Sequence, residues 1–147
     1  MGETHTMTDE QRRGLALEYF KKLDAGEAFF DLFAEDAQVY FPKWGVATGI
    51  EEIEEMFADV AETANAMSHD YATFNYVVDD ETVVVEGTST GEAADGTEWR
   101  PDGTPGGGRW CDVFEIRDGK IHRLFIYLDP DYAGADTDRY PWLEGEE

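Results

Sequence analysis

A carboxylate set among apolar residues is the feature of this sequence that most directly suggests chemistry. Residues 109–117 alternate as in a β-strand, and one face of that strand would carry Asp112 together with Trp110, Phe114 and Ile116. A carboxyl group on such a face costs free energy unless it is hydrogen-bonded or protonated. Asp112 is therefore either a structural acceptor for a neighbouring Tyr, Trp or backbone N–H, or a proton-handling group in a pocket.

Three more polar residues are candidates to act with Asp112. Tyr19 lies on the apolar stripe of the first expected helix, and its phenol with a protonated carboxyl would present two donors to a ligand oxygen. A buried Tyr–Asp hydrogen bond that only fixes the helix on the sheet is the alternative. His69 is a candidate base, although an exposed histidine at a strand end is the commoner case. Glu86 is either a second pocket carboxylate or an edge charge, because alternation does not say which face is inside.

The stretch 109–129 predicts a β-hairpin that positions Asp112. Its arms meet at Arg117-Asp118-Gly119-Lys120, and Asp-Gly between alternating apolar runs is a strong hairpin signal because Gly adopts positive φ at low cost. In the second arm, one face would carry His122, Leu124, Ile126 and Leu128, and the other Ile121, Phe125 and Tyr127. Both faces are apolar, so we expect the hairpin to be central and covered on both sides.

The rest of the chain predicts helices followed by strands. The expected elements are a helix capped by Thr8 and Gln11 and ending at Ala25-Gly26, a helix at Glu27–Phe33, a strand at Gln38–Phe41, a helix from a second capping box at Thr48–Glu51 to near Asn65, strands at Tyr71–Val78 and Thr82–Thr90, and a long connection at 91–108. This order predicts an α+β fold with helices on one side of a mainly antiparallel sheet. We expect one domain at 9–130 between tails at 1–8 and 131–147.

The charge of the chain excludes several partners. Among 147 residues, 34 are acidic and 11 are basic, which gives a net charge of -23. Such a surface does not favour nucleic acid or anionic membranes, because phosphate groups are bound by Lys and Arg. It suits a cytoplasm with very high salt, where self-repulsion is screened. The single cysteine, Cys111, indicates a packed residue in a reducing cytoplasm, and no run reaches transmembrane length.

Three short motifs resemble known sites without the required context. Gly87-Thr88-Ser89-Thr90-Gly91 matches the GxSxG string of α/β-hydrolases, but the string lies in an expected strand with no helix after it. The glycines at 103–108 lack the Lys-Ser/Thr of a phosphate loop. Asp129, Asp131 and Gly134 imitate an EF-hand start, but later positions lack oxygen ligands. We therefore predict no metal site.

Three stretches taken together resemble the nuclear transport factor 2-like superfamily, in its SnoaL-like and ketosteroid-isomerase-like branch. They are LALEYFKKLDAGEAFFDLFAEDAQVYFP, GIEEIEEMFADV and WCDVFEIRDGKIHRLFIYLDP, which span most of Gln11 to Pro130. The resemblance implies a cone-shaped, curved sheet wrapped around the long first helix. It also implies an apolar pocket in the cone and a homodimer through the outer sheet face.

The catalytic pattern of the isomerases carries over in part. There, a Tyr on the first helix and an Asp on a strand bind the developing oxyanion, and Tyr19 and Asp112 match these positions. The carboxylate that moves the proton stands just before the Pro that ends the first strand, and Phe41 occupies that position here. A second pocket Tyr of the isomerases falls near Phe57. The resemblance thus implies an oxyanion-binding side without the proton-moving carboxylate.

Two functions remain open from the sequence. The first is an acid–base enzyme without a cofactor, in which Tyr19 and Asp112 polarise a substrate oxygen and His69 or Glu86 moves the proton. The second is a non-catalytic module of the same fold that binds a ligand or dimerises. In both cases we expect a small apolar ligand, lined by Phe41, Phe57, Glu86, Trp110, Leu124 and Ile126.

Overall fold

A capping box starts the long helix α1 as the sequence predicts. The Thr8 hydroxyl accepts from the Gln11 N–H at 3.0 Å, and the Gln11 side chain accepts from the Thr8 N–H at 2.9 Å. Gly26 ends the helix in the left-handed conformation, with φ 72°. The computed structural model describes residues 7–101 and 108–128. Residues 1–6 of the predicted N-terminal tail, the predicted C-terminal tail, the glycines at 103–107 and the residues of the EF-hand-like string lie outside this part, whereas Thr8, predicted in the tail, is the N-cap residue of α1.

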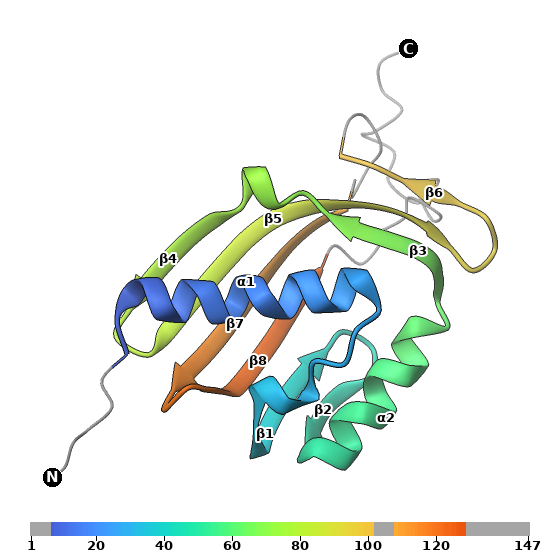
Figure 1. Cartoon of the computed structure of the whole chain (residues 1–147). Helices are drawn as coiled ribbons and strands as arrows, with labels where there is room; N and C mark the ends of the chain where they lie inside the picture. Colours follow the sequence, from blue (N-terminus) through green and yellow to red (C-terminus); the bar gives the residue numbers. More distant parts are fainter. Residues whose placement is uncertain (1–6, 102–107, 129–147) are drawn as a thin grey trace, which may run out of the picture.

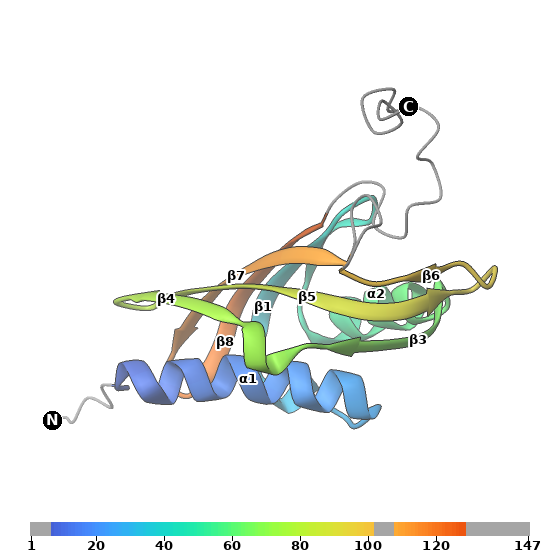
Figure 2. The same cartoon turned by 90° about the horizontal axis from the view of Figure 1, so that it is seen from above.

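The structure is a curved, open sheet that carries both α-helices on one face (Figures 1 and 2). In Figure 1, α1 runs across β4, β5 and β7, and α2 lies beside β1 and β2 at the other end of the sheet. The α+β fold predicted from the sequence is confirmed. The elements in chain order are α1 Asp9–Ala25, a 3-10 turn Phe30–Leu32, β1 Phe33–Phe41, β2 Gly45–Thr48, α2 Ile50–Ala61, β3 Ala64–His69, a 3-10 turn Tyr71–Thr73, β4 Asn75–Asp79, β5 Thr82–Ala93, β6 Glu98–Trp99, β7 Arg109–Arg117 and β8 Lys120–Leu128.

The long strand β5 joins two parts of the sheet. The strand order is β2-β1-β8-β7-β5-β3, with β4 and β6 also paired to β5. The first half of β5 pairs with β4 and β7, and its second half pairs with β3 and β6. All described pairs are antiparallel except β1 with β8. The predicted hairpin is therefore central, as expected, with β7 and β8 between β5 and β1.

The hairpin turn has the geometry that its Asp-Gly pair predicts. Asp118 and Gly119 have φ values of 55° and 74°, which is the pattern of a type I′ turn. The register shifts between Glu115 and Ile116, and this irregularity leaves His122 without a partner on β7. As a result Ile121 lies in the core with Leu124 and Ile126, which corrects the alternation expected for this arm.

The structure corrects several element boundaries upstream. The predicted helix at 27–33 is only one 3-10 turn, because Phe33 already pairs with Ile121 of β8 and belongs to β1. The predicted loop before α2 contains β2, and Gly49 rather than Thr48 is the N-cap residue of α2. The Thr48 N–H instead donates to the Glu52 carboxylate at 2.8 Å.

Two further corrections fall beside β5. The helix predicted to continue to near Asn65 ends earlier, and residues 64–69 form β3. His69 is therefore the last residue of a strand and does not stand at the start of the next one. The irregular connection predicted at 91–108 is shorter in the structure, because β5 continues to Ala93 and forms a hairpin with β6. In both cases pairing with β5 decides the structure, a tertiary effect that outweighs local propensity.

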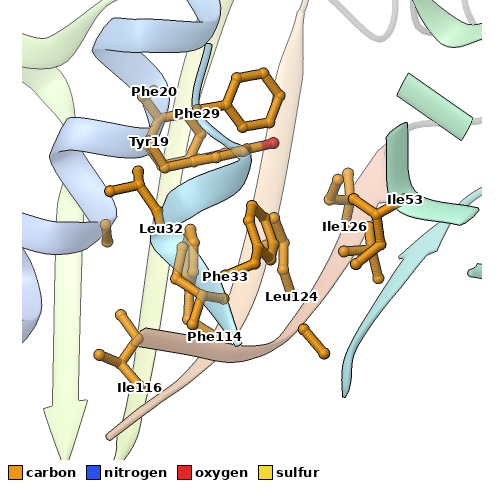
Figure 3. Packing of buried hydrophobic residues seen from close by; sticks show 14 of the residues in the cluster. Tyr19, Phe20, Phe29, Leu32, Phe33, Ile53, Phe114, Ile116, Leu124 and Ile126 are labelled. Carbon is orange, nitrogen blue, oxygen red and sulfur yellow. The ribbon is translucent and has the colours of Figure 1, made fainter. Parts of the chain in front are cut away.

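The core fills the space between the helices and the inner face of the sheet. Aromatic rings of α1, the 3-10 turn, β1 and β7 meet there with aliphatic side chains of α2 and β8 (Figure 3). The opposite face is not covered, contrary to the expectation that both sides of the hairpin are buried. Tyr127 and Val77 on that outer face are 48% and 61% exposed. No described helix is long and apolar enough to cross a membrane.

Candidate functional site

Asp112 lies on the inner face of β7, as the alternation predicts. Its cross-strand neighbours are Val85 of β5 and Ile126 of β8, and the residue is 3% exposed. No side chain in the described part of the protein is hydrogen-bonded to its carboxyl group. Burial raises the pKa of Asp112 well above its usual range, because a charged carboxylate is poorly solvated there. The neutral form, which can donate a hydrogen bond, is therefore favoured.

Tyr19 projects from α1 into the same interior and is 1% exposed. Burial raises the pKa of Tyr19 well above its usual value, and the charges of Asp112 and Asp24 raise it further. No hydrogen bond joins Tyr19 to Asp112, so a structural Tyr–Asp contact is not formed. The Tyr19 hydroxyl points toward the side of the core where Ile53 and Ile126 lie (Figure 3). Its ring is held edge-on by Phe20, Phe29, Phe33, Phe57 and Phe114, with centroids 4.9 to 6.4 Å apart.

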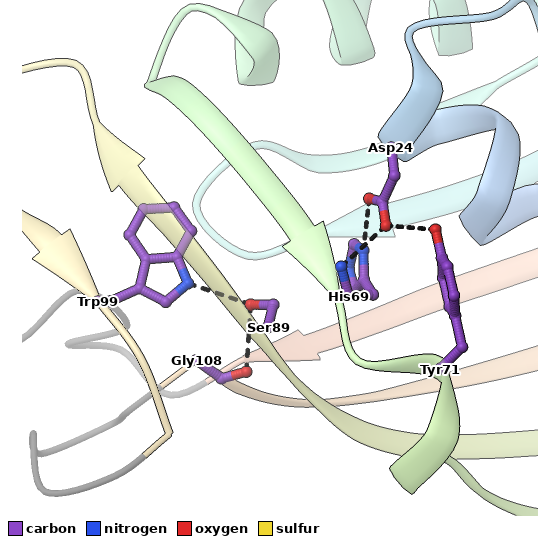
Figure 4. A network of polar contacts seen from close by, with 6 residues as sticks. All are labelled: Asp24, His69, Tyr71, Ser89, Trp99 and Gly108. Atoms are coloured by element: carbon purple, nitrogen blue, oxygen red, sulfur yellow. Dashed lines mark hydrogen bonds and ion pairs between the residues drawn. The ribbon is translucent and has the colours of Figure 1, made fainter.

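His69 is bound by a carboxylate that the sequence analysis did not select. The Asp24 Oδ1 atom lies 2.7 Å from His69 Nδ1, and Asp24 Oδ2 accepts from the His69 backbone N–H at 2.8 Å (Figure 4). Tyr71 donates its hydroxyl to the same Oδ2 atom at 2.6 Å. The side chains of His69 and Asp24 are only 7% and 9% exposed.

The electrostatics of this cluster favour a charged Asp24. Burial by itself raises the pKa of Asp24, but the hydrogen bonds from His69 and Tyr71 outweigh burial and lower the pKa below its usual value. The pKa of Tyr71 is raised by burial and by its hydrogen bond to Asp24. Asp24 is thus a carboxylate that accepts three hydrogen bonds at a helix end, beside the sheet.

Trp110 packs against His69 and lies on the same face of β7 as Asp112. Its ring centroid lies 5.3 Å from that of His69 and 4.8 Å from that of Phe20. Trp110 precedes Asp112 by two residues on β7, and both side chains face the interior. Its buried indole Nε1–H has no hydrogen-bond partner among the described residues. This donor is therefore available to a ligand oxygen.

Gly87 of β5 makes room for the Trp110 ring. A Cβ atom at residue 87 would lie 2.7 Å from Trp110 Cζ2 and 2.9 Å from Phe74 Cδ1. Any larger residue would push the indole off the strand, so the glycine of the GxSxG-like string has a packing role. Ser89 in this string is buried and its hydroxyl is bonded to Trp99 Nε1 at 3.1 Å and to the Gly108 carbonyl at 3.3 Å (Figure 4). The strand around Ser89 has no nucleophile elbow, in agreement with the sequence analysis.

The predicted lining residues divide into three groups. Phe57, Trp110, Leu124 and Ile126 are buried on the inner face, together with Asp112 and Tyr19. Phe41 is half-buried at the end of β1, where its ring packs edge-on against Trp44. Glu86 is exposed on the outer face, in register with Cys111, and accepts from Asn75 Nδ2 at 3.2 Å. The structure therefore does not bring Glu86 to Asp112.

Two open hollows are bounded by described residues. One, of about 360 Å³, lies between the start of α1 and β4 and is lined by Asp9, Arg13, Phe74, Asn75, Tyr76 and Val78. The other, of about 180 Å³, lies beside the β4–β5 turn. Neither is lined by Asp112 or Tyr19. Within residues 7–101 and 108–128, no group of three or more His, Cys, Asp or Glu side chains has the arrangement of a metal site.

Sequence reasoning missed Asp24 and Tyr71 for a physical reason. Asp24 is one of 34 acidic residues, and it stands 45 positions before His69. Asp70, the carboxylate next to His69 in the sequence, is exposed. Only the packing of the end of α1 against β3 selects Asp24.

The fold has many solved counterparts. A nuclear transport factor 2-like protein of unknown function from Burkholderia pseudomallei is 15% identical, covers 90% of this chain and 97% of its own, and superposes with a TM-score of 0.70. A candidate SnoaL-like polyketide cyclase from a Jannaschia species is 18% identical, covers 91% and 99%, and has a TM-score of 0.65. TerC, co-crystallised with polyporic acid, is 16% identical, covers 92% and 99%, and has a TM-score of 0.67. These likenesses establish the fold.

The sequence itself places the chain in a family. No curated protein matches it. The model of the SnoaL-like domain, however, matches residues 16–124, which include the part of α1 with Tyr19 and Asp24, the strand end at His69, and β7 with Asp112. This match shows that the chain belongs to the SnoaL-like domain family, and the solved counterparts show that it has the nuclear transport factor 2-like fold.

Proposed function

We propose that this protein is a small-molecule enzyme that performs acid–base chemistry, without a cofactor, on an apolar substrate containing oxygen. The substrate classes that fit are carbonyl compounds, epoxides and polyketide-like molecules. The observation that carries the proposal is Asp112, a carboxyl group on an apolar inner face, without a hydrogen-bond partner and with a raised pKa. A protein keeps such a group at a cost in stability, and proton handling is the usual benefit.

The donors and the base lie on different elements around the same interior. Asp112 in its neutral form and Tyr19 donate hydrogen bonds to the substrate oxygen, where negative charge develops in the reaction. His69 accepts the proton in place of the carboxylate that the isomerases carry at the position of Phe41. An indole N–H from Trp110 adds a third donor at the side nearest His69. Apolar side chains, among them Phe57, Leu124 and Ile126, exclude water and favour an apolar substrate.

The fold relatives support this class of ligand without specifying it. Among them are a candidate polyketide cyclase and a protein crystallised with polyporic acid. Both are below 25% identity, so the substrate has to come from experiment. A cytoplasmic location is compatible with the single cysteine and the charge of this chain.

A second function, a non-catalytic dimeric module, is favoured by a specific row on the outer face. Tyr40, Phe125, Val113, Val84 and Val77 are successive cross-strand partners over five strands of the sheet, from β1 to β4. Tyr127 extends the row, with its ring 5.8 Å from that of Tyr40. Such a continuous apolar row suits a second copy of the chain, in which the same row would pack against its equivalent. Dimerisation through this row is compatible with either function, so catalysis has to be tested separately.

A thermal-shift screen in high salt tests the enzyme proposal. Ketones with steroid-like skeletons, terpene epoxides and aromatic polyketides are added to the wild type, to Asp112→Asn and to the control Asp36→Asn, which changes an exposed carboxylate on β1. We expect one class to raise the Tm of the wild type and the control but not of Asp112→Asn. Compounds from that class are then assayed for turnover and for exchange of substrate hydrogen with deuterated water.

The outcomes separate the two functions. A stabilising ligand that is converted, with conversion lost in Asp112→Asn, supports the enzyme. A ligand that binds wild type and Asp112→Asn equally, or that binds without conversion, contradicts it and favours the binding module. Absence of stabilisation by every class overturns the pocket role of Asp112.

A further inference from the structure

The cluster of Asp24, His69 and Tyr71 gives the histidine a defined orientation and protonation pattern. We infer that Asp24 is a positioning residue, which holds His69 in the tautomer with its proton on Nδ1 and so leaves Nε2 as the basic atom. Only the role of Nε2 as the base of a reaction rests on the proposed function. The tautomer itself follows from the contacts around Asp24.

The first step concerns the Nδ1 atom. A carboxylate only accepts hydrogen bonds, so a ring nitrogen 2.7 Å from Asp24 Oδ1 must carry a proton. The other carboxylate oxygen is taken by the His69 backbone N–H and the Tyr71 hydroxyl. These donors lower the pKa of Asp24 and keep it charged, so the proton stays on the imidazole side of the contact. In the neutral imidazole, Nε2 is then the acceptor.

The second step concerns the position of the ring. The carboxylate binds both the backbone and the ring of His69, which fixes the side chain relative to the end of β3. The imidazole also packs against the rings of Phe20, Phe74 and Trp110, with centroids 5.1 to 6.5 Å away. Nε2 is separated from Nδ1 by one ring carbon, and its lone pair points in a widely different direction from the Nδ1–H bond, so it is directed away from Asp24. The Trp110 ring packs against the His69 ring, and its indole N–H has no partner among the described residues. We therefore infer that a ligand hydroxyl at this place accepts from Trp110 and donates to His69.

The third step gives the anchoring role to Tyr71. Its hydroxyl donates to Asp24 Oδ2 at 2.6 Å, and Lys21 lies over its ring at 5.7 Å. Tyr71 therefore supports the orientation of the Asp24 carboxylate, together with the His69 backbone N–H. It does not contact the His69 Nδ1 atom through any hydrogen bond in the described residues, so it acts through Asp24.

These contacts predict an unusual result for Asp24→Asn. The single amide oxygen would stay with its two donors, the His69 backbone N–H and the Tyr71 hydroxyl. The amide NH₂ would then face Nδ1, and two donors cannot share that contact. The imidazole must therefore move its proton to Nε2, which reverses the tautomer and removes the base from the interior side.

The experiment is ¹⁵N NMR of the histidine rings at a pH of about 8, with a second spectrum at about 9 to show that the rings are neutral. The chain has three histidines, and His69→Gln identifies the His69 signals. We expect the wild type to show the Nδ1–H form, Asp24→Asn to show the Nε2–H form, and Tyr71→Phe to keep the wild-type pattern. Asp70→Asn, which changes the exposed carboxylate next to His69, is the matched control and should keep the wild-type pattern as well.

The outcomes test the inference without any substrate. An Nε2–H form, or an equal mixture, in the wild type overturns it. An unchanged tautomer in folded Asp24→Asn also overturns it. If Asp24→Asn does not fold, the wild type and Tyr71→Phe spectra still decide. Failure of the ligand screen leaves these spectra unaffected. If a substrate is found, loss of about 10²- to 10⁴-fold in kcat for Asp24→Asn, with little change in KM, is the expected consequence.

Discussion

The replacement of Asp112 by Asn gives the sharpest test of the buried carboxyl. Asn has nearly the same shape and cannot ionise, so the variant reports the cost of charging this one group. Asp112 is 3% exposed, and its neighbours in register, Val85 and Ile126, offer no hydrogen bond. Hence the folded protein should hold the proton of Asp112 more tightly than the unfolded chain does.

The sign of the pH dependence follows from the raised pKa. In the unfolded chain Asp112 titrates near its ordinary value of about 3.9. Below that pH both states hold the proton, and the stabilising contribution is fully present. Above it the unfolded state loses its proton first, so the free energy of unfolding of the wild type falls relative to Asp112→Asn. The expected slope is about 1.4 kcal/mol per pH unit, up to the pKa of the folded state, where the difference becomes constant.

The assay is urea unfolding of both proteins in high salt over a pH series from about 4 to 9. Every other titrating group is present in both proteins, so the difference between the two unfolding free energies isolates Asp112. The pH at which the difference levels off gives the folded-state pKa directly. A difference that does not change with pH above about 4 would refute the reasoning, because it would mean that Asp112 ionises as in water.

Three further predictions follow from packing and charge. Gly87→Ala should lower the free energy of unfolding by about 1 to 3 kcal/mol, because its Cβ would lie 2.7 Å from Trp110 Cζ2. The control Gly14→Ala, in open space on α1, should raise the free energy of unfolding by up to about 1 kcal/mol. Equal effects of the two substitutions in urea unfolding would contradict the packing role of Gly87. The net charge of -23 predicts that the Tm rises as salt is added from low concentration, and a Tm independent of salt would exclude self-repulsion as a major cost. Sedimentation should show a dimer for the wild type and a monomer for the double variant Val77→Glu with Tyr127→Glu, whereas a monomeric wild type would remove the outer face as an interface.

Much of the fold follows from local patterns in the sequence. The capping box at Thr8 starts α1, and the Asp118-Gly119 pair makes the turn between the central strands. These signals depend on residues within a few positions of one another, so they act in any tertiary context. Alternation placed Asp112 on the inner face for the same reason. The stripe of α1 likewise placed Tyr19 inside.

Other elements were decided by partners distant in the chain. Residues 64–69 have no strong strand pattern of their own, but they form β3 because β5 offers a free edge there. The spacing of Phe29, Phe30 and Phe33 predicts a helix, but Phe33 pairs with Ile121 and begins a strand. The irregularity at His122 reverses the face of Ile121, which no count of alternating residues reveals.

The candidate site divides along the same line. The sequence by itself grouped Asp112 with the apolar residues of one strand face and placed Tyr19 on an apolar helix stripe, since each grouping is set by the period of its own strand or helix. Only the tertiary structure decided that Asp24 binds His69, that Tyr71 holds Asp24, and that Glu86 lies on the outer face. The physical reason is that a hydrogen bond between residues 45 positions apart depends on how a helix end packs against a strand, and local periodicity carries no record of that packing.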